Sequence, residues 1–289
     1  MTNRKKSGAT SKRANAKTTG TALALPSNDG TTLSALVPDS AFKVVPTALT
    51  PPESIFRDGR DVMVKGHAYV TREAAVQADE IYFVDEVTPS ADGPWLGEAD
   101  KIAWRDPSTG YECIMMRATV GGYLSGFVGI PPEHPLYGYE DDAIPLDLGI
   151  DVHGGLNYSE TCQEGPSPDP RWVPKGGIAS HSRRVCHGPP IPMVMVETKH
   201  ATDYRVQHDN AWWLGFSCNH LYDLVPGEGR SQGGYLRQET GQVYRDDGYV
   251  LGEITFLAAQ LRAIQDCEQL PKRIGDGPPP IGLDPHRGR

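Results

Sequence analysis

The chain has 289 residues, of which 38% are hydrophobic, with 32 glycines and 25 prolines. This composition predicts one core with long loops and tails rather than several compact domains. The formal net charge is −9, although positions 1–17 carry six Lys or Arg and no acid. Without those six positive charges the rest of the chain has a net charge of −15. Such an acidic body repels phosphate, which argues against a nucleic-acid binder of the patch-and-groove type.

Positions 1–58 predict a disordered basic tail. They mix Ser, Thr, Ala, Gly, Lys and Pro without a sustained period of two or 3.6, so they cannot bury enough apolar area to offset the entropy of ordering. This basic start is the one part of the chain that favours nucleic acid or an acidic partner, and a solvated tail is its simpler interpretation. Residues 59–270 are expected to form a single domain, and the Pro-rich residues 271–289 a second disordered tail.

Short strands dominate the first half of the expected domain. Residues 61–70 alternate in part and predict a strand, residues 71–79 predict a short helix, and residues 81–84 predict a strand. Three more predicted strands are joined by glycine-containing turns, which favours an antiparallel meander. They span residues 101–105, 111–118 and 123–130.

The second half is expected to begin with a strand over residues 146–152, where apolar side chains alternate up to His153. Residues 163–210 predict a loop-rich insert, and residues 212–218 predict another strand. Residues 244–268 predict one long helix, because apolar side chains recur there at spacings of three and four. The predicted fold is therefore α+β: an antiparallel, strand-rich single domain with one long C-terminal helix packed on the sheet.

His153 and His220 are the main candidate functional residues. Each lies at a predicted strand end, where a side chain can leave the core and face a cleft. Gly154 and Gly155 follow His153 and permit a sharp turn with positive φ. Such a turn exposes backbone N–H groups that can form an anion or oxyanion nest, and a plain turn is the competing interpretation.

Acid–base chemistry is the first hypothesis for these histidines. With Asp223 or Glu160 to orient the ring, His153 or His220 would exchange a proton near neutral pH. A structural histidine with satisfied hydrogen bonds is the competing interpretation.

Cys218 admits three interpretations. Residues two apart on a strand share a face, so Cys218 is in line with Leu214 and Phe216, which favours a small buried hydrophobe. As a nucleophile it would need an exposed thiolate and a histidine base. As a zinc ligand it would join the two histidines above, and the fourth ligand would be one of three residues. These are Cys186, His187 and Asp223.

Two other groups of residues suggest ligands. The acidic run at residues 140–142 offers carboxylates to Mg²⁺, although a solvated loop is its simpler interpretation. Four aromatic residues, together with the two glycines after His153, would line a cleft that captures a small-molecule ligand or a host protein. They are Tyr123, Tyr158, Trp212 and Trp213.

The five cysteines are widely spaced, and the sequence contains no hydrophobic signal segment. These features predict reduced thiols in a cytoplasmic protein. No apolar run approaches the roughly 20 residues that a membrane-spanning helix needs, so we expect no membrane partner.

Several segments together resemble an uncharacterised family of proteins encoded by bacteriophages and prophages. The similar segments lie between about residues 93 and 262. They are Gly121–Val128, His134–Gly138, Val152–Tyr158, Trp212–His220 with Asp223, and Tyr244-Arg245. The resemblance implies a compact α+β domain in a bacterial or phage-infected cell, and it implies no activity.

Two functions follow as expectations. The first is a small phage-type hydrolase or transferase that uses His153, His220 and Asp223 for acid–base chemistry. The second is a phage accessory protein without catalysis, which captures a host protein or small ligand in the aromatic-lined cleft. No cofactor is specified by the sequence beyond the zinc hypothesis.

Overall fold

The computed structural model describes residues 44–46, 54–90, 92–162, 177–187, 196–198, 201–203, 210–227 and 242–273. The remainder of the two expected tails and of the insert at 163–210 lies outside the described residues.

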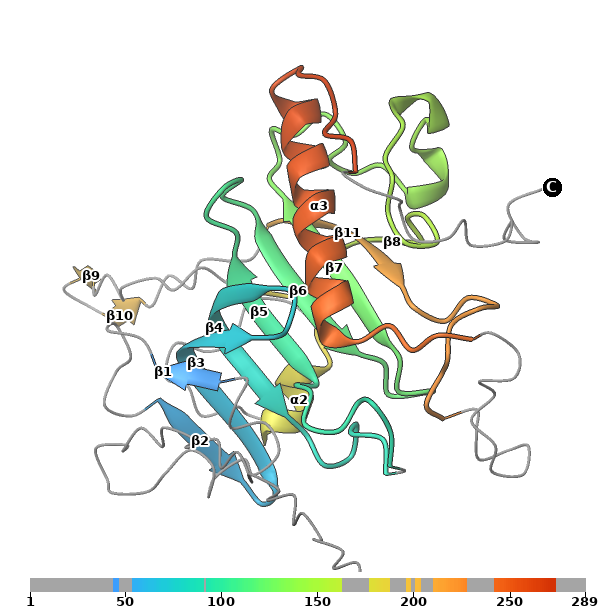
Figure 1. Ribbon diagram of the computed structural model, residues 1–289. Coiled ribbons are helices and arrows are strands. Elements are labelled where there is room, and N and C mark those ends of the chain that lie inside the picture. Colours follow the sequence, from blue (N-terminus) through green and yellow to red (C-terminus); the bar gives the residue numbers. More distant parts are fainter. Residues whose placement is uncertain are drawn as a thin grey trace, which may run out of the picture.

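Among the described residues, nine strands form one antiparallel sheet, shown in Figure 1. The strands are β1 (Val44–Pro46), β2 (Ile55–Asp58), β3 (Asp61–Val70), β4 (Ala75–Phe83), β5 (Lys101–Arg105), β6 (Glu112–Arg117), β7 (Leu124–Ile130), β8 (Tyr158–Thr161) and β11 (Trp212–Ser217). Their order is β1-β3-β4-β5-β6-β7-β11-β8, with β2 also paired to β3. Consecutive strands therefore neighbour each other from β3 up to β7, after which β11 inserts between β7 and β8. Two further strands, β9 (Val196–Thr198) and β10 (Ala201–Asp203), pair only with each other.

The predicted meander is confirmed in β5, β6 and β7. The register places Ile102 opposite Met115 and Met115 opposite Gly126. Strands β3 and β11 also form where the sequence predicts them. The strand-rich α+β class with an antiparallel sheet is therefore confirmed.

The helix predicted over residues 71–79 is wrong. Thr71 instead closes a tight turn, in which its N–H donates to the Ala74 carbonyl and its Oγ1 accepts from the Ala74 N–H. This turn joins β3 to β4, whose pairing runs from Val70 opposite Ala75 to Val62 opposite Phe83. Backbone hydrogen bonding along the long β3–β4 pair outweighs the weak local preference of residues 71–79 for helix.

The strand predicted over residues 146–152 is also wrong. Residues Asp141–Ala143 and Leu146–Leu148 form two short 3-10 helices, and no strand follows before β8 in this described stretch. Gly149 has a left-handed φ of 72°, which interrupts extended backbone, and Leu146 is 85% exposed rather than facing the core. His153 consequently lies in a loop, not at a strand end.

The predicted tail boundaries do not match the sheet. Strands β1 and β2 fall within positions 1–58, yet both pair with β3. At the other end, Arg273 reaches back and pairs with Asp151 and Glu253. The ordered body therefore takes in short pieces of both expected tails.

The long helix α3 (Asp247–Gln265) confirms the predicted C-terminal helix, with slightly narrower bounds. Asp246 caps its N-terminus by accepting a hydrogen bond from the Tyr249 N–H. Figure 1 shows α3 crossing the sheet over β6 and β7. The helix approaches so closely that a Cβ at Gly126 would lie 2.5 Å from Ile254 Cγ1. Its inward residues are fully buried, which places the main core between α3 and the sheet; these include Val250, Ile254, Leu257 and Leu261.

The opposite face of the sheet is covered by residues 177–187, which include the short helix α2 (Gly177–Ser182). Ile178 packs with Met63 and Tyr82, whereas the neighbouring residues on β3 face the main core. Val185 packs with Phe127 and other side chains of this second face. The sheet therefore has two covered faces.

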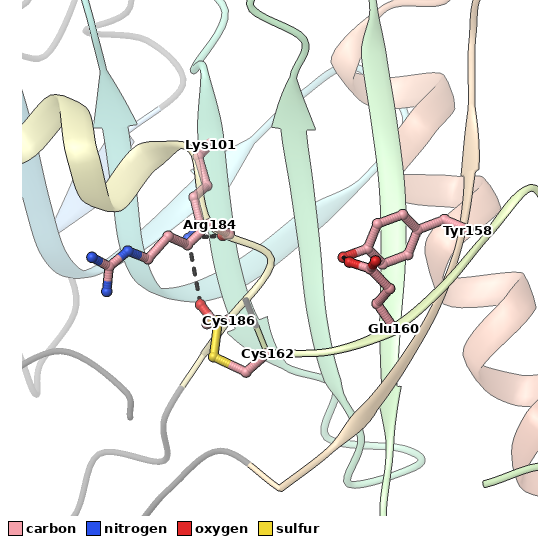
Figure 2. Close-up of a disulfide and its surroundings, with 6 residues drawn as sticks. All are labelled: Lys101, Tyr158, Glu160, Cys162, Arg184 and Cys186. Carbon is pink, nitrogen blue, oxygen red and sulfur yellow. Dashed lines mark hydrogen bonds between the residues drawn. A yellow bond between two sulfur atoms is a disulfide. The ribbon is translucent and has the colours of Figure 1, made fainter. Parts of the chain in front are cut away.

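The expectation that all five cysteines are reduced is wrong. Cys162, just after β8, forms a disulfide with Cys186, and their Cα atoms are 4.9 Å apart (Figure 2). The remaining three cysteines are free thiols. The sequence does not indicate this bond because the pairing depends on residues 177–187 folding back across the sheet to the end of β8.

Candidate functional site

Two imidazoles and one carboxylate meet beside the N-terminal half of α3. His153 comes from the loop before β8, and His220 and Asp223 come from the loop after β11. The His153 and His220 ring centroids are 5.2 Å apart. We call His153, His220 and Asp223 the His–Asp cluster. The two distant histidines therefore lie together, but the His153 side chain is 0% exposed and does not face a cleft as the sequence predicts.

The Asp223 carboxylate holds the cluster together. Its Oδ2 accepts from His153 Nε2 at 2.8 Å, from His220 Nδ1 at 3.2 Å and from the His220 backbone N–H at 2.9 Å. Its Oδ1 accepts from Arg245 Nε at 3.0 Å. Burial alone would raise the pKa of Asp223, but the hydrogen bonds from His153 and His220 outweigh it, so the pKa lies well below the ordinary value. Asp223 is therefore an anion with four N–H groups directed at its carboxylate.

Two neighbours hold the His153 ring. Its Nε2 lies 2.8 Å from Asp223 Oδ2, and its Nδ1 lies 2.9 Å from Tyr249 Oη. Burial, and then the charge of Glu253, raise the pKa of Tyr249 well above its ordinary value, so this hydroxyl stays protonated. Both ring nitrogens of His153 are thus occupied, and its side chain is 0% exposed.

His220 is arranged differently. Its Nδ1 lies 3.2 Å from Asp223 Oδ2, and its Nε2 has no hydrogen-bond partner among the described residues. Its side chain is 11% exposed, whereas those of His153 and Asp223 are 0% and 1% exposed. Within the cluster, His220 is therefore the ring that a ligand can reach.

Gly154 makes room for the His220 ring. A Cβ at this position would lie 2.0 Å from His220 Cε1 and 2.2 Å from its Nε2. Gly154 and Gly155 both have positive φ, as the sequence predicts, and the Gly155 N–H closes a turn onto the Val152 carbonyl. The geometry therefore assigns Gly154 a packing role against His220, and the Gly155 N–H is already used within the turn.

Helix α3 anchors the His153 loop. The Glu253 carboxylate accepts from the His153 backbone N–H at 2.9 Å and pairs with Arg273, whose Nη2 lies 2.7 Å from it. Gln260 also holds the loop, because it accepts from the Asp151 N–H and donates to the Asp151 carbonyl.

Cys218 is not part of this cluster. It is 2% exposed and belongs to the main hydrophobic core, and burial, followed by the charge of Asp223, raises the pKa of its thiol well above the ordinary value. The buried-hydrophobe interpretation is confirmed, and the nucleophile hypothesis lacks the exposed thiolate it needs.

The donor set of the His–Asp cluster, two imidazole nitrogens and a carboxylate oxygen, is one that transition metals accept. Its three ligand atoms lie within 4.8 Å of one another, and it is the only such group found among the described residues. Of the three residues predicted as the additional ligand, Asp223 belongs to the cluster. The other two do not: Cys186 is in the disulfide, and His187 pairs with Asp79 at 3.1 Å against the other sheet face. Arg245 also already neutralises the one carboxylate of the set.

The remaining predicted site residues are dispersed. Glu160 and Tyr158 lie on β8 and share the sheet face that residues 177–187 cover, whereas the imidazoles lie beside α3. Figure 2 shows the Tyr158 and Glu160 side chains next to each other. Trp213 is fully buried on that same face. Trp212 points the other way and donates from Nε1 to the Tyr139 carbonyl. These aromatics therefore do not line one cleft.

Two smaller predictions are placed as follows. Tyr123 directly precedes β7, and its ring atoms lie 3.1 and 3.3 Å from a Cβ built at Gly121. In the acidic run, Ser159 Oγ lies 3.0 Å from Glu140 Oε2 and 3.1 Å from Asp141 Oδ1, so the two carboxylates share its single hydrogen. The group of possible metal ligands found among the described residues does not include this run.

Three residues of the site were not predicted from the sequence. Tyr249 and Glu253 lie in the periodic stretch of α3, where the pattern indicates only which residues face the core. Arg245 belongs to a segment of the phage-family resemblance, and this is the one signal that pointed toward it. Their roles depend on which loops approach the helix.

The chain matches no protein-family model, no curated protein and no solved structure. The phage-family resemblance accordingly stays a prediction. No helix within the described part of the chain is both long and apolar enough to cross a membrane.

Proposed function

We propose that the chain is a small enzyme of the hydrolase or transferase class in which His220 and Asp223 form an acid–base pair. One observation supports this most: His220 Nδ1 lies 3.2 Å from the ionised Asp223 carboxylate, and Nε2 has no hydrogen-bond partner among the described residues. A general base requires this arrangement, because the carboxylate orients the ring with Nε2 outward and stabilises the imidazolium that forms.

In the proposed mechanism, His220 Nε2 takes a proton from a water or a substrate hydroxyl and returns it to the leaving group. Histidine suits both directions because its ordinary titration lies near neutral pH. Asp223 does not itself accept the proton, since its pKa is held low. His153 and Arg245 keep the carboxylate in place, and Tyr249 keeps the His153 ring from turning.

Substrate would approach from the side of the loop after β11. Leu221 and Tyr222, next to His220, are 66% and 45% exposed, and Val243, whose N–H donates to the Tyr222 carbonyl, is 52% exposed. An apolar surface beside a reactive imidazole favours a substrate with an apolar portion near the bond that reacts.

The test is turnover of chromogenic esters, phosphate esters and glycosides by the full chain. We expect His220→Ala to abolish turnover without unfolding the protein. His187→Ala is the matched control, because His187 also pairs with a carboxylate but lies against the opposite sheet face. A substrate that the wild type and His220→Ala turn over equally would contradict the proposal.

The same experiment separates two other functions. Turnover that a chelator abolishes and a divalent metal restores would assign the His–Asp cluster to a metal centre instead. Non-catalytic capture of a ligand or host protein is the second candidate, supported by the exposed apolar side chains beside His220. A ligand whose affinity falls in step with the effect of His220→Ala would favour capture over catalysis.

A further inference from the structure

Residues 177–187, which we call the strap, cover the sheet face opposite α3. The strap is short: its helix α2 has six residues, too few to be stable alone in water. Two apolar side chains, Ile178 and Val185, pack into the clusters on this face and are 3% and 2% exposed. Its position therefore depends on what ties it to the sheet.

A buried lysine of the sheet forms one tie. Lys101, on the central strand β5, is 2% exposed, and its Nζ donates to the carbonyl oxygens of Arg184 (2.7 Å) and Cys186 (3.4 Å), as Figure 2 shows. His187 adds a second tie through its contact with Asp79 on β4. A buried ammonium is costly unless such acceptors surround it, so the strap and Lys101 stabilise each other.

The disulfide forms the third tie, and it is covalent. It joins Cys186, at the end of the strap, to Cys162, which directly follows the edge strand β8. Cys186 is 5% exposed, whereas Cys162 is only partly buried. The sulfur that a reductant meets is therefore that of Cys162, at the edge of the sheet.

We propose that this disulfide is a redox-sensitive latch: its reduction by a dithiol releases the strap and uncovers the second face of the sheet. The reductant's thiolate attacks the Cys162 sulfur, the S–S bond breaks, and Cys186 leaves as a thiolate that takes up a proton. The reductant's second thiol then displaces Cys162 from the mixed disulfide. The protein gains two electrons and two protons as two thiols, and the dithiol becomes a disulfide.

Release has two physical consequences. Lys101 exchanges two carbonyl acceptors for water, and the apolar cluster under the strap loses its cover; this cluster includes Ala103, Ile114, Phe127 and Trp213. The two states would then differ in apolar surface on this face, while α3 and the His–Asp cluster keep their contacts. In a reducing cytoplasm the open state gains population, and in an oxidising compartment the closed state does.

The experiment is hydrogen–deuterium exchange of the oxidised full chain, with and without dithiothreitol. Alkylation and mass measurement report the redox state of Cys162 and Cys186. We expect reduction to speed exchange of the strap amides on the order of 100-fold, because the covalent constraint no longer opposes opening. Exchange in α3 should stay unchanged, which would show that the fold persists.

Two variants make the outcome specific. Cys162→Ser with Cys186→Ser should show the fast strap exchange without any reductant. Cys267→Ser is the matched control, because Cys267 is an exposed free thiol, and it should respond to dithiothreitol as the wild type does. If the double variant does not fold, reduction of the wild type alone decides. Unchanged strap exchange after complete reduction, or free thiols at both positions in the oxidised protein, would overturn the proposal.

Discussion

Replacing Gly154 by alanine should destabilise the protein more than the same change at Gly149. Both glycines have left-handed backbone, with φ of 66° and 72°, so alanine costs roughly 1–2 kcal/mol of backbone strain at either position. A Cβ at Gly149 would meet nothing within 4 Å, whereas a Cβ at Gly154 would overlap the His220 ring. Moving that ring breaks its hydrogen bond to the ionised Asp223, which adds about 1.5–3 kcal/mol.

The expected loss is therefore about 2.5–5 kcal/mol for Gly154→Ala, the sum of these two costs, and about 1–2 kcal/mol for Gly149→Ala, which has the backbone cost alone. Urea unfolding followed by fluorescence of the five tryptophans measures both variants against the wild type. Gly154→Ala should also lose any activity that depends on His220, whereas Gly149→Ala should keep it. Equal destabilisation by the two changes would refute the argument that Gly154 exists to admit the His220 ring.

Three further predictions concern buried charge and the disulfide. Asp223→Asn should cost about 3–5 kcal/mol at neutral pH. The lowered pKa of Asp223 stabilises the wild type above pH 3.8, the ordinary pKa, and this stability is lost as pH falls through the folded pKa. The free energy of unfolding of Asp223→Asn should therefore fall less in acid than that of the wild type. Glu98 is 3% exposed and pairs with the buried Arg117. Burial raises the pKa of Glu98 above its ordinary value of 4.5, so the stability that its protonated form contributes is lost as pH rises through the folded pKa. Above pH 4.5 the free energy of unfolding should therefore fall more with rising pH in the wild type than in Glu98→Gln. Reducing the Cys162–Cys186 disulfide, with a sequence separation of 24, should lower the free energy of unfolding by about 3 kcal/mol in urea titrations with and without reductant.

Some of the fold and of the candidate site could be predicted from the sequence. The meander β5–β6–β7 and the helix α3 were predictable because their apolar residues recur with the period of the element, which is a local property. The prediction of a helix over residues 71–79 failed because pairing with β3 is decided across a turn. The strand predicted from the alternating residues 146–152 failed for a similar reason, because no strand in the described part of the chain pairs with this segment.

The sequence by itself determined the strand-rich α+β class, the long helix, and the candidate status of His153, His220 and Asp223, because each follows from residue type and short-range spacing. Only the tertiary structure decided what surrounds these residues. His153 and Asp223 are 70 positions apart, and His153 and Glu253 are 100 apart, so their contacts arise from loops packing on α3. The same holds for the position of Glu160 and for the Cys162–Cys186 disulfide, because what covers each face of the sheet depends on segments far away in the chain.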